Sequence, residues 1–334
     1  MWHVGIDLHR ATVVMAAVSD TGEAMRPITI ACQHTAAIVD AAKKLTPFRA
    51  VIEASGTYRW LYDLLRPYGT ILLAHPLRLR AMIQRRSKTD KLDAQLLADL
   101  LRINQIPLAY IPPEPYQQLR DLTRCRARLA RDQAMVKIKL RALLARRNRQ
   151  APYRVPFGVR GIVWFRKQDF GPIENLIRDE LLARLDHFGR QLAIVDQHMT
   201  ARCAAFPQTE VLTSIHGIGL FSALLIVGEI GEVDRFRTAK QVGAYAGLTS
   251  RVHQSGDHCY RGPISRQGSP WLRWILVEAA MKVTREDAAL KNFYTRVRKR
   301  SSAKIARVAC ARKLAEISWK RLRRWHAEHV PAST

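Results

Sequence analysis

The stretch HVGIDLHRATVVMAAVSD, residues 3–20, contains two apolar runs joined by a tight connection. Runs of this kind, rich in Val and Ile, predict short strands. The Thr-Gly pair at 21–22 is a turn signal before EAMRPITIAC (23–32), so the pattern indicates an antiparallel meander of three strands. Asp7 ends the first run, at a point where the strand should remain buried. Because a buried carboxylate without a partner costs several kcal/mol, Asp7 is a candidate for a functional site.

The next segments alternate between helical and strand patterns. They are HTAAIVDAAKKL (34–45, helix), RAVIEA (49–54, strand), TYRWLYDLLRPYG (57–69, helix), TILLAH (70–75, strand) and TDKLDAQLLADLLRINQ (89–105, helix). The order of three strands, helix, strand, helix, strand, helix matches the ribonuclease-H-like arrangement. The predicted fold class is therefore α/β for this part of the chain, in a fold whose sheet commonly carries metal-binding carboxylates.

The remainder of the chain is predicted to be mainly helical. After a proline-containing linker, the segment 119–149 carries nine Arg and two Lys against two Asp at helical spacing. A second amphipathic helix over 173–204 predicts an antiparallel hairpin, interpreted as a coiled coil. HGIG (216–219) is typical of a helix-hairpin-helix turn, and basic helices follow, with Trp271, Trp274 and Trp319 as anchors. The predicted domains are 1–110 (ribonuclease-H/RuvC-like), 111–206 (basic hairpin) and 207–334 (C-terminal domain).

Charge indicates the class of partner. The 334 residues carry 55 Lys and Arg against 28 acids, a formal net charge of +27. Such an excess favours a polyanion, with nucleic acid as the expected partner and an anionic membrane as the alternative. No apolar run of about 18 residues and no secretory signal is seen, so we expect no membrane. The five cysteines form no CxxC pair, which indicates reduced thiols in a cytoplasmic protein and argues against zinc.

Three further acidic residues extend the Asp7 hypothesis. Asp90 and Asp93 lie at i and i+3 on one predicted helix, where like charges repel unless a cation is near. Helix capping is an alternative role for both. Glu53 ends the buried run RAVI, and adjacent strands would bring it to Asp7 at one end of the sheet. Four oxygen donors in one cleft suit Mg²⁺ or Mn²⁺, with two metals about 4 Å apart.

Several motifs occur in an order that resembles a known family. They are GID (5–7), EASGTY (53–58), KTDKLDAQLLA (88–98), SIHGIG (214–219), AYAGLTSR (244–251) and the Ser-Gly of HQSGD followed by ISRQGSPWLR (264–273). Together they resemble the DEDD-type insertion-sequence transposases, which are related to the Piv pilin-gene invertase and include the bridge-RNA-guided recombinases. The resemblance spans about 1–105 and 211–280.

This resemblance implies catalytic roles and partners. It implies that Asp7, Glu53, Asp90 and Asp93 form the Mg²⁺-binding tetrad of a RuvC-like domain, and that Ser255 attacks DNA phosphate. It also implies a bridge RNA and a dimer or tetramer whose composite sites pair one protomer's tetrad with another's serine. The chain has Gln254 and Asp257 where many relatives have a second serine and a second small residue. The nearby candidates Ser250, Ser265 and Ser269, and a plain turn role for Ser255, therefore stay open.

Basic residues surround the candidate serine. Arg251, Arg261, Arg266 and Arg273 flank it, and Arg298 and Arg300 lie in the basic run 296–307. Guanidinium groups bind phosphate bidentately, so we expect these residues to contact nucleic acid. The expected function is a DNA transposase or recombinase of a bacterial or archaeal insertion sequence. A covalent serine–phosphate intermediate would retain the bond energy and make ATP unnecessary, and no GxxxxGK[ST] loop is found. Alternatives are a junction endonuclease that uses water and a non-catalytic nucleic-acid scaffold.

Overall fold

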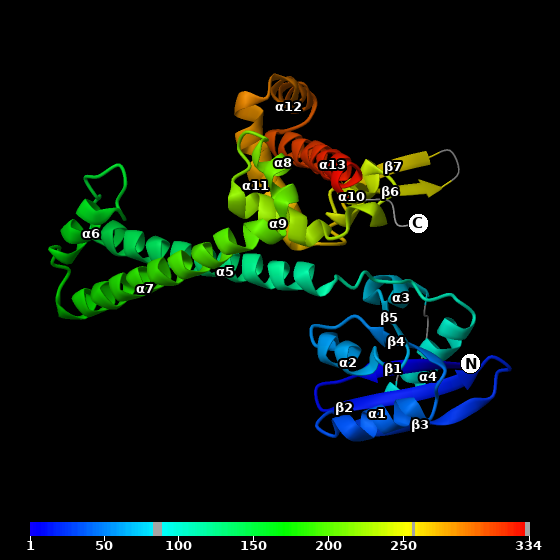
Figure 1. Ribbon diagram of the computed structural model, residues 1–334. Coiled ribbons are helices and arrows are strands. Elements are labelled where there is room, and N and C mark those ends of the chain that lie inside the picture. The colour runs from blue at the N-terminus through cyan, green and yellow to red at the C-terminus, as the bar shows by residue number, and fades with distance from the viewer. Residues whose placement is uncertain (83–88, 256–257, 331–334) are drawn as a thin grey trace. The chain divides into compact units, whose positions relative to one another are not determined.

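The computed structural model describes residues 1–82, 89–255 and 258–330. Lys88 of the KTDK motif, Gly256 and Asp257 lie outside the described residues. The chain divides into two compact units, Met1–Ile111 and Pro112–Thr334 (Figure 1). Each unit has its own hydrophobic core and is described by itself.

The first unit contains a mixed sheet with the strand order β3-β2-β1-β4-β5. Its strands are β1 (Trp2–Leu8), β2 (Thr12–Ser19), β3 (Ala24–Ala31), β4 (Phe48–Glu53) and β5 (Thr70–Ala74). Strands β1, β2 and β3 form the expected antiparallel meander, whereas β4 pairs parallel with β1 and β5 parallel with β4. This order and these directions are compatible with the predicted ribonuclease-H-like arrangement.

Side-chain alternation divides the sheet into two packed faces. Val4, Ile6 and Ile52 pack in one core with residues of α1 (Thr35–Lys43) and α2 (Tyr58–Leu65). On the other face, Val51 packs with Leu97 and Leu101 of α4. Helix α4 spans Asp90–Arg102. The short helix α3 (Pro76–Met82) follows β5 in the chain. Residues of β1 and β4 that alternate with Ile6 and Ile52 therefore face α4.

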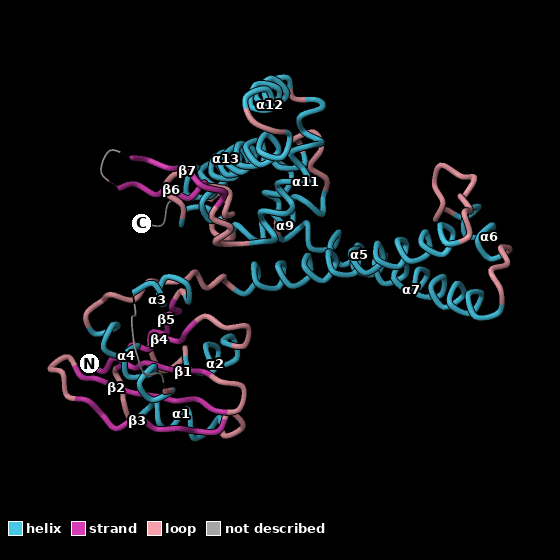
Figure 2. The backbone as a smooth tube through the Cα atoms, turned by 180° about the vertical axis from the view of Figure 1, so that it is seen from behind, coloured by secondary structure: helices cyan, strands magenta, loops and turns pink. Residues whose placement is uncertain are grey.

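The second unit begins with two long helices that run side by side in opposite directions (Figures 1 and 2). These are α5 (Glu114–Arg146) and α7 (Pro172–Arg202), with α6 (Val159–Arg166) between them in the chain. Phe165 of α6 is fully buried at the far end with Leu140 and Leu185. Helix α5 begins inside the proline-containing segment expected to be a linker, because proline is tolerated in the first helical turn. A coiled-coil geometry and the division of this unit at 206 stay predictions.

The rest of the second unit is helical apart from one two-stranded ribbon. Its elements are α8 (Glu210–Thr213), α9 (Leu220–Ile230), α10 (Ala239–Tyr245), β6 (Ser250–Ser255), β7 (His258–Ile264), α11 (Pro270–Glu286), α12 (Ala288–Arg300) and α13 (Ala303–His329), with 3-10 turns at Cys203–Ala205, Pro207–Thr209 and Val233–Arg235. The apolar helix α9 is buried from Ala223 to Ile230 and forms the centre of this core.

Two arginines of the basic helix α5 point into this core. Arg120 is 6% exposed and donates to the carbonyl oxygens of Gly228 and Glu229 at 2.7 and 2.8 Å. Arg124 forms a two-pronged ion pair with the fully buried carboxylate of Glu229, at 2.8 and 3.0 Å. These contacts fix α5 to the C-terminal end of α9. Part of the positive charge of α5 therefore serves packing, and the nucleic-acid interpretation does not apply to these two residues.

Two expectations about the chain's environment can be compared with the structure. Among the described residues, we find no helix with the length and apolar character needed to cross a bilayer. All five cysteines are free thiols, as expected from their spacing. Burial raises the pKa of the Cys310 thiol to about 11, so this cysteine is an inert core residue rather than a nucleophile.

Candidate active site

The position of Asp7 follows from the close packing of β1 against α4. Gly5 faces α4, and a Cβ built on it would overlap the carbonyl oxygen of Ala94. Asp7 lies two residues further along the strand and therefore projects from the same face. Its side chain is 14% exposed at the end of the sheet where α4 begins. A glycine at position 5 thus brings the start of α4 close to Asp7.

Asp7, His9 and Asp90 form the centre of the candidate site. His9 Nε2 lies 3.0 Å from Asp7 Oδ2 and 3.2 Å from Asp90 Oδ1. One ligand atom from each of the three residues lies within 4.8 Å of the others, and among the described residues this is the group with metal-binding spacing. His9 was not among the site residues predicted from the sequence. The sequence feature that could have indicated a role for His9 is its position two residues after Asp7, just past the end of β1.

The electrostatics of the site disfavour an isolated carboxylate at position 7. Burial raises the pKa of Asp7 above its usual value, and the negative charges of Asp90 and Asp93 raise it further. The nearby imidazole of His9 acts in the opposite direction and lowers the pKa. A divalent cation would favour the ionised form of all three carboxylates, so the donor set fits such an ion.

Glu53 and Asp93 are not members of the set within 4.8 Å, although Asp93 is close enough for its charge to act on Asp7. The parallel register pairs Ile6 with Ile52, so Glu53 follows on β4 where Asp7 follows on β1. Asp93 is in the first turn of α4 with Asp90. The residue that caps this helix is Thr89, whose hydroxyl accepts from the Leu92 amide at 3.3 Å. The N-cap role considered for the two aspartates is therefore wrong, although both still lie at the positive end of the helix dipole.

The candidate nucleophile lies in the second unit, on the β6–β7 ribbon. Ser255 is the last residue of β6 and pairs with His258. Its side chain, and those of His253 and Arg261, lie outside the described residues. Ser269, one of the alternatives, is 8% exposed, caps α11 and donates to Glu229 Oε2 at 2.8 Å. That bonding commits Ser269 to the core, which leaves Ser250 and Ser265 as the described alternatives.

The arginines expected to bind phosphate differ in their surroundings. Arg273 donates to the carbonyl oxygens of Ala246 and Arg266 at 3.0 and 3.2 Å, so its guanidinium ties the loop to α11. Arg251 is exposed and contacts the Ser265 carbonyl oxygen at 3.4 Å. Arg298 and Arg300 are exposed in the last turn of α12. These three remain available to an anion, whereas Arg273 already makes two internal contacts.

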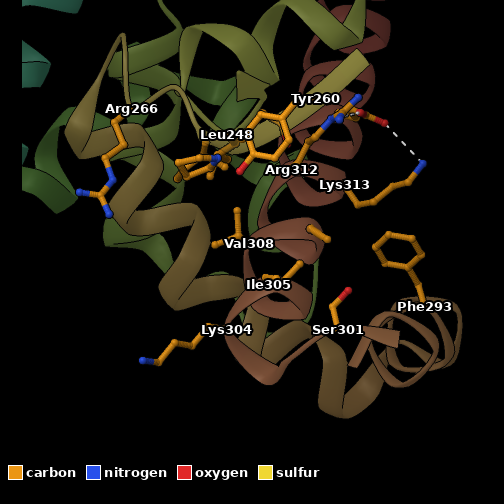
Figure 3. A pocket seen from close by; sticks show the side chains of 16 residues that line it. Leu248, Tyr260, Arg266, Phe293, Ser301, Lys304, Ile305, Val308, Arg312 and Lys313 are labelled. Atoms are coloured by element: carbon orange, nitrogen blue, oxygen red, sulfur yellow. Dashed lines mark ion pairs between the residues drawn. The ribbon is translucent and has the colours of Figure 1, made fainter. Parts of the chain in front are cut away.

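A pocket of about 1050 Å³ lies beside the β6–β7 ribbon. Tyr260 of β7 and residues of α12 and α13 line it, and Figure 3 shows Tyr260 near Arg312 and Lys313. Glu316 pairs with Arg312 at 3.4 Å and with Lys313 at 3.6 Å. Arg266 and Lys304 add positive charge to the lining. The pocket is therefore basic as well as partly apolar, next to the strand that ends at the candidate serine. This pocket could not be predicted from the sequence, because its residues come from distant segments.

Two family models match the chain. A model described as "Transposase IS116/IS110/IS902 family" matches residues 209–295. A second model, named for the DEDD transposases of the IS110 group and described as "Transposase", matches residues 4–148. The first match includes the β6–β7 ribbon, and the second includes all four acidic candidates.

Curated relatives are similar at low identity over most of the chain. The chain is 25% identical over 275 residues to the transposase named y4qE of Sinorhizobium fredii; the alignment covers 80% of this chain and 64% of that protein, just under two thirds of its length. It is 26% identical over 304 residues to a family 20 transposase of Pseudomonas aeruginosa, covering 86% and 88%. It is 27% identical over 280 residues to the pilin gene-inverting protein of Moraxella bovis, covering 80% and 78%.

Proposed function

The chain belongs to the IS110 family of transposases, and from this premise we propose that it is a DNA recombinase that cuts and rejoins strands. In this proposal Asp7, Glu53, Asp90 and Asp93 hold Mg²⁺, and Ser255 is the nucleophile. The proposal depends above all on one observation. Asp7 and Asp90, far apart in the chain, lie at a shared imidazole with metal-binding spacing.

The residues of the first unit would act through their charge. In this proposal Asp7 and Asp90 supply hard oxygen ligands, and Glu53 and Asp93 complete the set. The register of β4 against β1 and the first turn of α4 support including these two. A bound divalent cation would activate the attacking oxygen and stabilise charge on the leaving oxygen. His9 contacts both central carboxylates and is a further candidate ligand or orienting residue.

Ser255 would supply the covalent step. Its hydroxyl oxygen attacks the scissile phosphorus and displaces the 3′ or 5′ oxygen of the neighbouring nucleotide. The serine gives up its proton and the displaced oxygen takes one up to become a hydroxyl, so the step has no net proton change. Attack by a deoxyribose hydroxyl on the serine phosphodiester then restores the DNA bond and the serine. The phosphodiester energy is retained, so no ATP is needed. We propose that the tetrad of one protomer works with Ser255 of another, in a dimer or tetramer.

We further propose that a structured bridge RNA selects the DNA. A net charge of +27 supports binding of more than one nucleic-acid strand. No zinc-finger, homeodomain or basic-zipper pattern is found in the sequence, which suits a mechanism in which RNA pairing selects the DNA. Sequencing the RNA that copurifies with the protein tests this. A structured RNA encoded beside the gene supports guidance, and random cellular RNA contradicts it.

The nucleophile is tested by trapping the intermediate. Wild-type protein with Mg²⁺ and labelled DNA should form an adduct that survives denaturing electrophoresis, and peptide mass spectrometry should place the phosphate on Ser255. Ser255→Ala should abolish both adduct and cleavage, whereas the matched Ser265→Ala should retain them. An adduct that persists in Ser255→Ala would contradict the assignment.

A hydrolytic endonuclease is the second candidate function. It is favoured by the location of the metal-binding group, whose three residues all belong to the first unit. Such an enzyme would cut DNA with water, and Ser255→Ala would keep full strand cleavage without any adduct. Asp7→Asn separates both enzymes from a non-catalytic scaffold, since only a scaffold would keep its biological activity.

A further inference from the structure

A second cavity lies in the C-terminal unit, away from the ribbon that carries Ser255. It is enclosed by α5, by α9 with the turn before it, and by α11, and its volume is about 800 Å³. Pockets for small ligands range over about 300–1,000 Å³, so the space can receive a group as large as a nucleotide. No residue of this cavity was proposed above as part of the catalytic site.

Aromatic rings line one wall of the cavity. Trp274 is 41% exposed, so it is not the buried anchor that the sequence suggested, unlike Trp319, which is 4% exposed. The Trp274 ring lies 6.3 Å from that of Trp271 at 83°, and 6.2 Å from that of Phe221 at 60°. Large aromatic surface left open to water costs free energy in the unbound protein. The three rings are steeply inclined to one another, so they do not form a single flat surface. The exposed ring of Trp274 is the one on which a flat group can stack.

Arginines lie over two of these aromatic rings and along the edge of the cavity. The Arg126 guanidinium is 4.7 Å from the centre of the Phe221 ring, and that of Arg128 is 5.7 Å from the Trp271 ring. Arg126 is also paired with Asp196 at 3.0 Å. The exposed Arg131 and the exposed Lys282 on α11 have no carboxylate partner within ion-pair distance among the described residues. One acidic residue, the exposed Glu278, also lines the cavity. Arg128, Arg131 and Lys282 outnumber it, so the rim carries net positive charge beside the aromatic rings.

We propose that this aromatic cleft binds an unpaired nucleotide of single-stranded DNA. The base stacks on Trp274, and the flanking phosphates contact Arg128, Arg131 and Lys282. Every base has a π-face, and aromatic platforms beside cationic side chains are the general solution for single strands. Duplex DNA does not fit, because its base faces are covered by neighbouring pairs. A second copy of this chain is disfavoured because it too carries a net charge of +27.

The inference rests on the proposed function in one respect, namely that DNA strands are the substrate and become unpaired during exchange. It adds a site that holds such a strand. The test therefore measures binding in EDTA, where the proposed metal chemistry cannot occur. A failure here leaves the cleavage assays unaffected, and a failure of cleavage leaves this binding measurable.

The experiment compares Trp274→Ala with Trp274→Phe in the full chain, using a single-stranded oligonucleotide that carries 2-aminopurine. Trp274→Ala should weaken binding by roughly 5- to 100-fold and reduce the fluorescence quenching, since base–aromatic stacking is lost. Trp274→Phe should retain most of both. Arg131→Gln/Lys282→Gln should lower the slope of log K against log salt by about 1.4, or 0.7 per phosphate contact on a single strand. Circular dichroism melting checks that each variant is folded.

Trp325→Ala is the matched control, because Trp325 lies on α13 and lines a different cavity. It should bind the oligonucleotide like wild type. Three results would overturn the proposal: unchanged affinity in folded Trp274→Ala, an equal loss for duplex DNA of the same sequence, or tighter wild-type binding of the corresponding single-stranded RNA than of the DNA. The last result would assign the cleft to RNA.

Discussion

Gly5 of β1 and Ala94 of α4 pack so closely that no side chain fits between them. A Cβ at Gly5 would overlap the Ala94 carbonyl oxygen and approach Leu97 Cβ to 2.8 Å. The backbone of a helix cannot yield without moving the whole element. The separation between β1 and α4 therefore depends on the absence of a side chain at position 5, and with it the distance between Asp7 and Asp90.

Replacing Gly5 with Ala should displace α4 and weaken the metal site. Overpacking a tight contact costs about 1–3 kcal/mol, and the displacement should also move Asp90 away from Asp7. We expect a lower melting temperature and a weaker Mn²⁺ affinity by calorimetric titration. Gly189→Ala is the matched control, since a Cβ there meets nothing within 4 Å and helical Ala is favoured over Gly. A Gly5→Ala protein with wild-type melting and Mn²⁺ binding would contradict the packing argument.

Asp7→Asn should have opposite effects on stability with and without metal. Burial and the charges of Asp90 and Asp93 disfavour a carboxylate at position 7, so removing its charge should raise the melting temperature in EDTA. The variant should lose the stabilisation that wild type gains from millimolar Mg²⁺ or Mn²⁺. Differential scanning fluorimetry with a metal titration measures both effects. Asp40→Asn, at an exposed position on α1, should change neither; a metal response retained by Asp7→Asn would exclude Asp7 as a ligand.

The meeting of Asp7 with Asp90 was accessible from the sequence because it follows from a few rules. An acidic residue that ends a buried strand must find a partner, and the element order fixes which strands are neighbours. Helical spacing then places Asp90 and Asp93 together on α4. What the spacing could not show is Gly5. Gly5 matters because it has no side chain, and a pattern of apolar residues does not show where two backbones approach closely.

Other features depend on three-dimensional contacts that periodicity does not encode. His9 was overlooked because its role depends on which atoms its ring reaches beyond the strand. In the sequence, Arg120 and Arg124 do not differ from the other basic residues of α5. In the structure they bind the backbone carbonyl oxygen and the carboxylate of Glu229, near the end of α9. Trp274 looked like a core residue, because tryptophan usually is one. For His9, Arg120 and Arg124, a contact that defines the role lies far away in the chain, at Asp90 or at the end of α9.

Glu229→Gln should destabilise the C-terminal unit strongly. The carboxylate is fully buried and binds Arg124 and Ser269, so its neutralisation leaves the guanidinium without a counter-charge. Breaking a buried pair costs about 3–5 kcal/mol; Arg124 is 26% exposed, so we expect about 2–4 kcal/mol. Calorimetry should show the transition of this unit shifted to lower temperature. Glu180→Gln, which breaks the exposed pair with Arg184, should cost less than about 1 kcal/mol. Equal shifts in melting temperature for the two variants would show that the buried pair stabilises the fold no more than the exposed pair does.

Arg298→Gln/Arg300→Gln should weaken binding to duplex DNA in a salt-dependent way. Both side chains are exposed at the end of α12, where the basic run continues into α13. If each contacts one phosphate, the slope of log K against log salt should fall by about 1.8, or 0.9 per contact. Arg184→Gln/Arg190→Gln removes the same charge from α7, where each arginine is already paired within its own helix, to Glu180 and Asp186. Fluorescence anisotropy at several salt concentrations should therefore give a near wild-type slope for this control. Identical slopes for both double variants would mean that only net charge matters and that α12 is no specific phosphate-binding surface.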